Sequence, residues 1–287
     1  MQLIGNRVNG LSVRQSDKQQ IAEQLLGLCQ QAGQAILDIY HAAEPVAVEQ
    51  KQDASPLTRA DIVSHDIISK GLATLTPQWP VLSEEQAMPD FTERSQWSCY
   101  WLLDPLDGTR EFIDRSGEFT INIALIEHHR PVLGMVYIPL QQAAYLGFVE
   151  EKKALRIDSS GRSDIVTSNK TPGDSIRVLS SSRYGGAELE SCIDKLARHF
   201  QPVERITAGS ALKFCRLAEG AADIYPRFAP CCEWDTAAGQ AVLEAAGGCL
   251  VGMDFKPLQY NHRASILNPH FYALGGECKL WAEILEG

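Results

Sequence analysis

Positive charge is scarce in this sequence. Lys and Arg number 26 against 36 Asp and Glu, and the formal net charge is −10. This balance argues against a surface that coats nucleic acid or binds anionic lipid, so no nucleic-acid partner is expected. A protein of this charge that handles phosphates needs local positive charge, from bound metal ions or from a few well-placed Lys and Arg side chains.

Long apolar runs and organised cysteines are missing as well. No stretch approaches the ~18 apolar residues of a membrane-spanning helix, and the beginning of the sequence lacks the apolar run of a signal peptide. The eight cysteines are scattered, without a Cys-x-x-Cys pair or a zinc-type spacing. We therefore expect reduced thiols and a cytoplasmic protein with no integral membrane segment.

What is present is the composition of an ordinary globular protein, 45% hydrophobic and 22% charged over 287 residues. Residues 1–15 are polar and unpatterned, and we expect a flexible extension there. Residues 16–168 are predicted to form an α+β, metal-binding subdomain, and residues 169–287 an α/β, substrate-binding subdomain. The boundary lies near the turn residues Thr171-Pro172-Gly173-Asp174, where the pattern changes.

Periodicity predicts the elements of the first subdomain. Apolar residues recur at helical spacing from Asp17 to His41, with Asp17 as the N-cap, and again from Leu57 to Leu75, in a helix that carries Asp61. The strands of a mainly antiparallel sheet are predicted at Pro80–Ser83, Tyr100–Leu103, Phe119–Ile126, Pro131–Ile138 and Gln142–Val149.

In the second subdomain strands and helices alternate, as they do in α/β proteins. The predicted strands are Arg177–Ser181, Val203–Ile206 and Asp223–Tyr225. The predicted helices are Ala187–Phe200, Ser210–Leu217 and Trp234–Ala246, the last of them ended by Gly247-Gly248.

The most informative stretch is Leu103–Thr109, in which Asp104 and Asp107 flank Pro105 and precede a Gly-Thr pair. Because Pro105 cannot donate to a sheet ladder, we expect the preceding strand to end there. Both carboxylates can then face one space, beside backbone amides that can bind an anion. Carboxylates for a hard cation next to amides for an oxyanion indicate a metal-assisted phosphate site. By itself, the stretch is equally typical of a polar turn.

Acidic residues recur in similar settings elsewhere. Glu84 and Glu85 follow the Pro80–Ser83 strand, and Asp235 opens the predicted helix Trp234–Ala246. Taken alone, the Glu pair is typical of a solvated loop, and Asp235 of a helix cap.

Taken together and in this order, the three stretches resemble the metal-binding motifs of the inositol monophosphatase superfamily. The resemblance runs from about Ile21 to Asn268. It implies a layered αβαβα sandwich with the site between two subdomains. It also implies a Mg²⁺-dependent phosphatase that lithium inhibits.

Further phrases resemble the branch of 3'(2'),5'-bisphosphate nucleotidases of bacterial sulfate assimilation. They are Pro80–Glu85, Gly117–Thr120, Ser210–Cys215 and Tyr225–Phe228. This resemblance implies hydrolysis of adenosine 3',5'-bisphosphate to AMP and phosphate, and in some members of the 2',5' isomer or of 3'-phosphoadenylyl sulfate. An inositol or sugar monophosphate phosphatase is the rival function. A non-catalytic metal-binding regulatory protein is a more remote one.

The resemblance implies a set of Mg²⁺ ligands. Glu84, Asp104 and the Leu106 carbonyl would hold one ion, and Asp104, Asp107 and Asp235 a second, with a third ion bound more weakly. Two ions ~4 Å apart can clamp phosphoryl oxygens and lower the pKa of the attacking water.

The resemblance also implies catalytic residues. Thr109 would hydrogen-bond the attacking water, and Asp61 would accept a hydrogen bond from Thr109. Glu85 would assist water on the same ion.

Substrate contacts are implied in the same way. The phosphate would contact metal-site residues and the backbone amides that follow them, namely Glu84, Leu106, Asp107, Gly108, Thr109 and Asp235. The rest of the nucleotide would contact three polar residues, namely Ser210, Lys213 and Arg227. Arg227 stands where the inositol branch is typically acidic, and an Arg can fork onto phosphate oxygens. Tyr184 replaces a His that contacts nucleotide in some relatives, so base preference or affinity is expected to differ.

Two expectations remain. Cys231 and Cys232 lie just before Asp235, and we hypothesise that their oxidation perturbs this ligand. Members of the superfamily occur as monomers or homodimers, and both states stay open. The branch also implies a peripheral location at the cytoplasmic face of the inner membrane, although the sequence shows no anchor.

Overall fold

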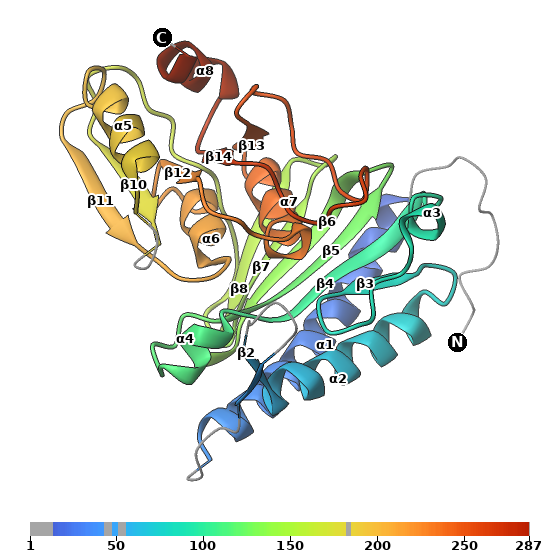
Figure 1. Ribbon diagram of the computed structural model, residues 1–287. Coiled ribbons are helices and arrows are strands. Elements are labelled where there is room, and N and C mark those ends of the chain that lie inside the picture. The colour runs from blue at the N-terminus through green and yellow to red at the C-terminus, as the bar shows by residue number, and fades with distance from the viewer. Residues whose placement is uncertain (1–13, 43–47, 51–55, 182–184, 287) are drawn as a thin grey trace.

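The computed structural model describes residues 14–42, 48–50, 56–181 and 185–286 (Figure 1). The helices are α1 (Gln15–Tyr40), α2 (Arg59–Leu75), α3 (Phe91–Arg94), α4 (Thr109–Ile113), α5 (Ala187–Leu196), α6 (Leu212–Ala218), α7 (Ala237–Ala245) and α8 (Cys278–Glu286), with 3₁₀ turns η1 (Pro139–Gln141) and η2 (Glu233–Asp235). The predicted extension over residues 1–15 falls mostly outside the described residues, and Gln15 belongs to α1. Within the described part of the chain, no helix is both long enough and apolar enough to span a bilayer.

One sheet has seven strands in the order β3-β4-β5-β6-β7-β8-β9. Their bounds are β3 (Val81–Ser83), β4 (Cys99–Asp107), β5 (Thr120–Glu127), β6 (Arg130–Ile138), β7 (Ala143–Phe148), β8 (Lys153–Asp158) and β9 (Gly161–Asp164). Every pair is antiparallel except β3 with β4, which is parallel. The predicted sheet is confirmed, but β8 and β9 were not predicted, because their partly exposed residues lack an apolar pattern.

A second sheet has five strands in the order β11-β10-β12-β14-β13. Its strands are β10 (Ile176–Ser180), β11 (Val203–Thr207), β12 (Ile224–Arg227), β13 (Cys249–Gly252) and β14 (Phe271–Leu274). β10 pairs in parallel with β11 and β12, and β14 is antiparallel to its neighbours β12 and β13. The remaining strands, β1 (Val48–Gln50) and β2 (Pro56–Thr58), form a small antiparallel pair.

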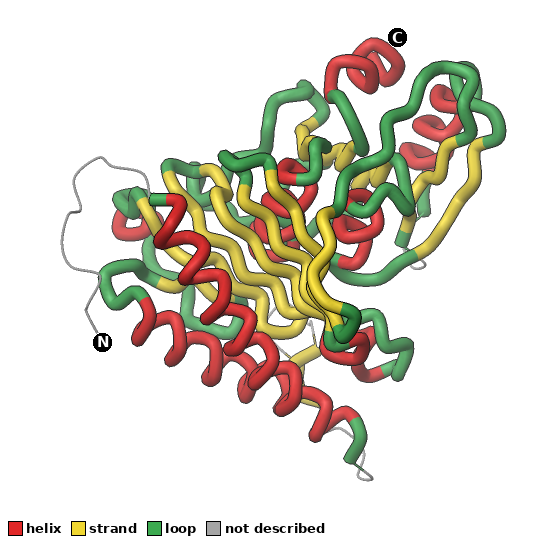
Figure 2. Tube along the Cα trace, turned by 180° about the vertical axis from the view of Figure 1, so that it is seen from behind, coloured by secondary structure: helices red, strands yellow, loops and turns green. Residues whose placement is uncertain are grey.

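The helices and sheets form five layers (Figures 1 and 2), and three apolar cores fill the space between the layers. α1 and α2 cover one face of the seven-stranded sheet, α6 and α7 lie between the two sheets, and α5 and α8 cover the far face of the five-stranded sheet. β4 shows why its sequence is apolar throughout: Trp101 and Leu103 face α1 and α2, while Tyr100 and Leu102 face α6 and α7. The predicted αβαβα sandwich is confirmed.

Two glycines let α7 lie directly on the seven-stranded sheet. A Cβ at Gly134 would be 2.6 Å from the Ala238 carbonyl oxygen, and one at Gly147 would be 2.5 Å from that of Ala241. A helix late in the sequence thus shares a core with strands formed early. The division at residues 168 and 169 stays a prediction.

Several predicted boundaries were wrong for local reasons. Arg14, not Asp17, is the N-cap of α1, and the two side chains pair at 3.0 Å within the first turn. β4 continues through Pro105 to Asp107, because the ladder with β5 shifts register there and Pro105 needs no partner.

The helices of the second subdomain are shorter than predicted. α5 ends at Leu196 and α6 begins only at Leu212, since Ser210 has a left-handed φ of 50°. The predicted helix Trp234–Ala246 consists of η2 followed by α7.

Candidate active site

Glu84 and Glu85 lie in the turn that follows β3. The Glu84 amide donates to the Leu103 carbonyl on β4 at 3.1 Å, and the Glu85 amide donates to Ser83 Oγ at 3.4 Å. Ser83 Oγ in turn lies 2.9 Å from His65 Nδ1 on α2. Since β3 and β4 run parallel, both acidic residues lie at the end of the sheet that also carries Asp104.

The irregular end of β4 is fixed by two contacts. Ser64 Oγ on α2 donates to the Pro105 carbonyl at 2.7 Å, and the Leu106 amide donates to Asp104 Oδ1 at 3.1 Å. Gly108 follows with φ +91°, and a Cβ there would be 3.0 Å from the Glu118 carbonyl oxygen. Only glycine suits this close left-handed turn, which leads into α4 at Thr109.

Thr109 and Asp61 form the pair that the sequence indicated. Thr109 Oγ1 donates to Asp61 Oδ1 at 3.2 Å. The other oxygen of this buried carboxylate accepts from the Thr58 amide at 2.8 Å and from Thr58 Oγ1 at 2.6 Å. Asp61 is therefore the third residue of α2 and forms a capping box with the N-cap Thr58, which holds the carboxylate in the orientation that Thr109 uses.

Asp235 ends the turn η2. The Cys232 amide donates to Asp235 Oδ2 at 2.8 Å. Asn268 Nδ2 donates to the Cys232 carbonyl at 2.7 Å and to Thr236 Oγ1 at 3.0 Å. These bonds tie the turn to the segment that follows β13, a tertiary context that the sequence pattern does not reveal.

Electrostatics place the four predicted acidic ligands in one group. Burial raises the pKa of the Asp104 carboxyl well above its usual range, and the charges of Glu84, Asp107 and Asp235 raise this pKa further. Burial and the charges of Asp107 and Glu84 likewise raise the pKa of Asp235, although Arg227 opposes the shift. Side chains from three separate segments thus concentrate negative charge in a buried space.

This donor set fits a hard cation. Concentrated buried carboxylates are stabilised by positive charge, and Mg²⁺ prefers oxygen ligands. As the side chains stand, however, no three His, Cys, Asp or Glu residues of the described segments are arranged to hold an ion. The chemistry of the group favours Mg²⁺, and the assignment of individual ligands stays a prediction.

Asp107 has two polar neighbours, of which the sequence analysis missed Asn122. Its Oδ2 accepts from Asn122 Nδ2 at 3.1 Å and from Ser210 Oγ at 2.7 Å, and Ser210 Oγ lies 2.6 Å from Thr120 Oγ1. The isolated polar residue Asn122 inside the apolar run Phe119–Ile126 was the available signal. Ser210, predicted to contact substrate, is hydrogen-bonded to a predicted metal ligand.

Lys213 is buried rather than solvated. Its Nζ donates to the Ser210 carbonyl at 2.8 Å and to the Ala208 carbonyl at 3.2 Å, and lies 5.2 Å from the centre of the Tyr225 ring. Burial lowers the pKa of this ammonium to about 8, although the charge of Asp107 opposes the shift. Lys213 therefore holds the loop that carries Ser210, and a direct contact with substrate stays a prediction.

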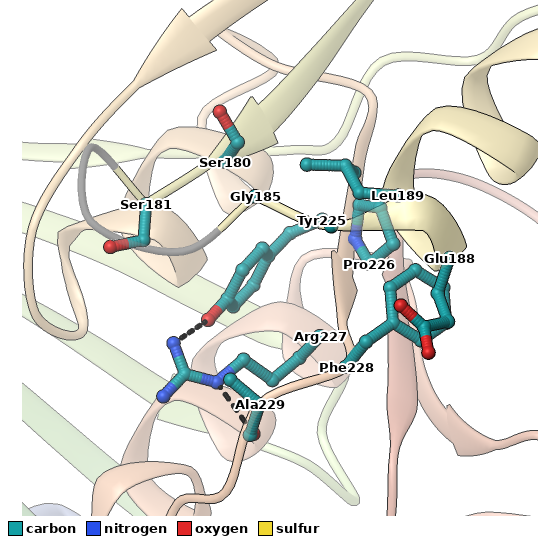
Figure 3. A pocket seen from close by; sticks show the side chains of 11 residues that line it. Ser180, Ser181, Gly185, Glu188, Leu189, Tyr225, Pro226, Arg227, Phe228 and Ala229 are labelled. Carbon is teal, nitrogen blue, oxygen red and sulfur yellow. Dashed lines mark hydrogen bonds between the residues drawn. The ribbon is translucent and has the colours of Figure 1, made fainter.

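Arg227 borders a cavity of about 100 Å³ between β12 and the start of α5 (Figure 3). Its guanidinium donates to the Ala229 carbonyl at 3.0 Å and to the Pro230 carbonyl at 2.9 Å, and Nη1 lies 3.4 Å from the Tyr225 hydroxyl. The apolar part of the lining comes from Leu189, Tyr225, Pro226 and Phe228. The cavity thus combines an oriented cation with aromatic and apolar walls, and the carboxylate of Glu188 also lines it.

Two expectations about single residues end differently. Tyr184 lies outside the described residues. Burial and the charge of Asp235 raise the pKa of Cys231 to about 12, and the same causes raise the pKa of Cys232. Raised thiol pKa values of this kind leave few thiolates at neutral pH. The hypothesis that oxidation of these cysteines perturbs Asp235 stays a prediction.

Comparison with known proteins gives a consistent picture. The model of the inositol monophosphatase family matches residues 17–284. The chain is 45% identical, over 249 residues, to "3'(2'),5'-bisphosphate nucleotidase CysQ" of Escherichia coli strain K12. This match covers 87% of this chain and 97% of the relative. It is 34% identical to the protein of the same name from Haemophilus influenzae, over 93% of this chain and 97% of the relative.

Solved structures agree with the sequence relatives. The crystal structure of CysQ from Bacteroides thetaiotaomicron has a TM-score of 0.79 and 35% identity, covering 90% of this chain and 98% of that one. SuhB from Bartonella henselae, at 20% identity and a TM-score of 0.71, shares the fold over 93% of this chain and 99% of that one. Members of the family are metal-dependent phosphatases, typically with Mg²⁺. This chain belongs to the inositol monophosphatase family.

Proposed function

We propose that this chain is a Mg²⁺-dependent 3'(2'),5'-bisphosphate nucleotidase that converts adenosine 3',5'-bisphosphate to AMP and phosphate. The observation that carries the proposal is the buried carboxylate group next to the Thr109–Asp61 hydrogen bond. It occurs in a chain that is 45% identical to relatives with this name. The proposal extends to the 2',5' isomer and to 3'-phosphoadenylyl sulfate.

The residues of the site divide the work. Mg²⁺ held by Glu84, Asp104, Asp107, Asp235 and the Leu106 carbonyl would supply positive charge against the phosphoryl oxygens. We infer two such ions and a third, weaker one.

Thr109 and Asp61 orient the attacking water. Thr109 Oγ1 lies 3.2 Å from Asp61 Oδ1 and 3.4 Å from the Leu106 carbonyl oxygen. Its proton is therefore donated within the protein, which leaves the hydroxyl oxygen to accept a hydrogen bond from that water. The backbone amides of Gly108 and Thr109 would donate to phosphate oxygens at the start of α4. Glu85 would assist the water held on the same ion.

The cavity beside Arg227 suits the rest of the nucleotide. A guanidinium binds phosphate in a bidentate manner, and the walls formed by Tyr225, Phe228 and Leu189 suit a base or ribose. An inositol phosphate offers hydroxyls in place of a second phosphate, so it would gain less from the positive charge of Arg227. We further propose action in the cytoplasm, and the choice between monomer and homodimer stays open.

Product analysis tests this function. The purified protein is incubated with Mg²⁺ and adenosine 3',5'-bisphosphate, and the nucleotides are separated by chromatography. Adenosine 5'-monophosphate as the sole new nucleotide is expected. Adenosine 3'-monophosphate, or intact substrate beside hydrolysed inositol 1-phosphate, would contradict the proposal.

A further inference from the structure

A buried arginine lies between the two segments that supply the first acidic residues of the site. Arg94 is the last residue of α3, and α3 follows Glu84 and precedes Asp104 in the chain. Arg94 is only 1% exposed. A long cationic side chain is rarely buried unless it is paired, so its partners indicate what it does.

Its partners come from the other end of the chain. Arg94 Nη1 donates to Asn261 Oδ1, and Nη2 donates to the Ala264 carbonyl at 2.5 Å and to the Arg263 carbonyl at 3.4 Å. Asn261 returns a hydrogen bond, from Nδ2 to the Arg94 carbonyl at 2.5 Å. The forked guanidinium therefore holds the segment 261–264 at several atoms, a geometry that an ammonium could not match.

The same segment holds the turn that carries Asp235. The backbone amide of Asn261 donates to Glu233 Oε2 at 2.8 Å, and the backbone amide of Glu233 donates to the Ile266 carbonyl at 2.9 Å. Glu233 is fully buried and is the first residue of η2, two positions before Asp235. The charge of Arg94 also lowers the pKa of the Glu233 carboxyl, against the larger rise that burial causes.

We propose that Arg94, acting through Asn261 and Glu233, is a positioning residue that fixes Asp235 against Glu84 and Asp104. We call Arg94, Asn261 and Glu233 the Arg94 clamp. The inference rests on the proposed function, because Asp235 is a ligand only if the carboxylate group binds metal. Residues that orient metal ligands typically contribute ~10–100-fold to metal affinity.

The test measures metal binding without turnover. Wild type and Arg94→Met are titrated with Mn²⁺ under native conditions, and free Mn²⁺ is followed by electron paramagnetic resonance. The clamp predicts that Arg94→Met binds Mn²⁺ at least ~10-fold more weakly at one site, with Arg94→Lys between the two. Glu233→Ala is expected to resemble Arg94→Met, and Glu233→Gln, which still accepts from the Asn261 amide, to bind more tightly than Glu233→Ala.

Lys18→Met is the matched control. Lys18 is also a fully buried cation and pairs with Glu150 at 2.5 Å, but it lies on α1. The variant Lys18→Met should have a lower thermal midpoint than wild type and keep wild-type Mn²⁺ affinity. Equal affinity in Arg94→Met and wild type would overturn the clamp while leaving the function intact. A wild-type protein that binds no Mn²⁺ would overturn the proposed function and the clamp with it.

Discussion

The Thr109 hydroxyl donates to Asp61 at 3.2 Å, with the Leu106 carbonyl as a second, longer acceptor at 3.4 Å, and Asp61 is itself held through its second oxygen by Thr58. The hydrogen bonds among these three side chains therefore orient the Thr109 hydroxyl. These hydrogen bonds do not require a metal ion, since each is made within the protein. The same pre-set geometry is what general-base catalysis needs, because a misplaced water reacts slowly.

Removing the hydroxyl at this position should affect the chemical step alone. Thr109→Val keeps the shape of the side chain but cannot orient water, so kcat is expected to fall ~10²–10³-fold with little change in KM or in thermal midpoint. Thr109→Ser restores the hydroxyl and should recover most of kcat. Steady-state kinetics check this, and near-wild-type kcat in Thr109→Val would remove Thr109 from the mechanism.

Arg227 is expected to select the substrate. Arg227→Glu places a negative charge where the proposal puts the second phosphate, so KM for adenosine 3',5'-bisphosphate should rise by ~10-fold or more. KM for inositol 1-phosphate should change much less. Both constants are measured at saturating Mg²⁺. A similar change for the two substrates would deny Arg227 a selective role.

At the scale of elements, the site depends on how closely α7 approaches the seven-stranded sheet. The turn η2 leads directly into α7, and the register of this helix on β6 and β7 fixes where Asp235 lies. Gly134 and Gly147 leave room for the helix backbone. Small residues in these strands therefore serve the site from a distance.

Filling this contact should destabilise the fold. The new methyl group of Gly147→Ala would meet the backbone of α7, and overpacking of this kind costs ~1–3 kcal/mol. Gly27→Ala is the matched control, because Gly27 lies within α1 with no atom within 4 Å of its would-be Cβ, and it should stabilise by ~0.5–1 kcal/mol. Urea denaturation measures both. Equal stability of Gly147→Ala and wild type would contradict the packing described.

The elements also show what sequence could and could not predict. Strands buried on both faces, such as β5 and β6, were predicted because their sequences are mainly apolar. The acidic residues and Thr109 were predicted to be site residues because their spacing resembles that of a known family. Asn122, Thr58 and Arg94 were missed, since each acts through a partner that only the fold brings near: Asp107, Asp61 and Asn261.

At the scale of the whole molecule, the dominant feature is the excess of acidic over basic residues. The net charge is −10, and part of it is buried where α7 and the sheet meet. Because the folded pKa values of Asp104 and Asp235 are raised, the native state binds more protons than the unfolded state above pH ~4. Without metal, this contribution to stability is present at low pH and is lost as pH rises through the folded pKa values.

Neutralising one member of the group should therefore stabilise the metal-free protein. In EDTA at pH 8, Asp235→Asn is expected to have a higher thermal midpoint than wild type, and the difference should shrink toward pH 5. Added Mg²⁺ should raise the midpoint of wild type far more than that of the variant. Thermal denaturation under these conditions checks the sign. A variant less stable than wild type at pH 8 in EDTA would contradict it.

The most direct measurement is phosphate release from adenosine 3',5'-bisphosphate and inositol 1-phosphate in parallel, with Mg²⁺, with EDTA, and with Mg²⁺ plus Li⁺. A nucleotide phosphatase built on a buried carboxylate group should prefer the bisphosphate, lose activity in EDTA and be inhibited by Li⁺. Preference for the inositol ester would keep the metal site and reject the role of Arg227. Release that is unchanged in EDTA, or absent with both substrates, would contradict the proposed function.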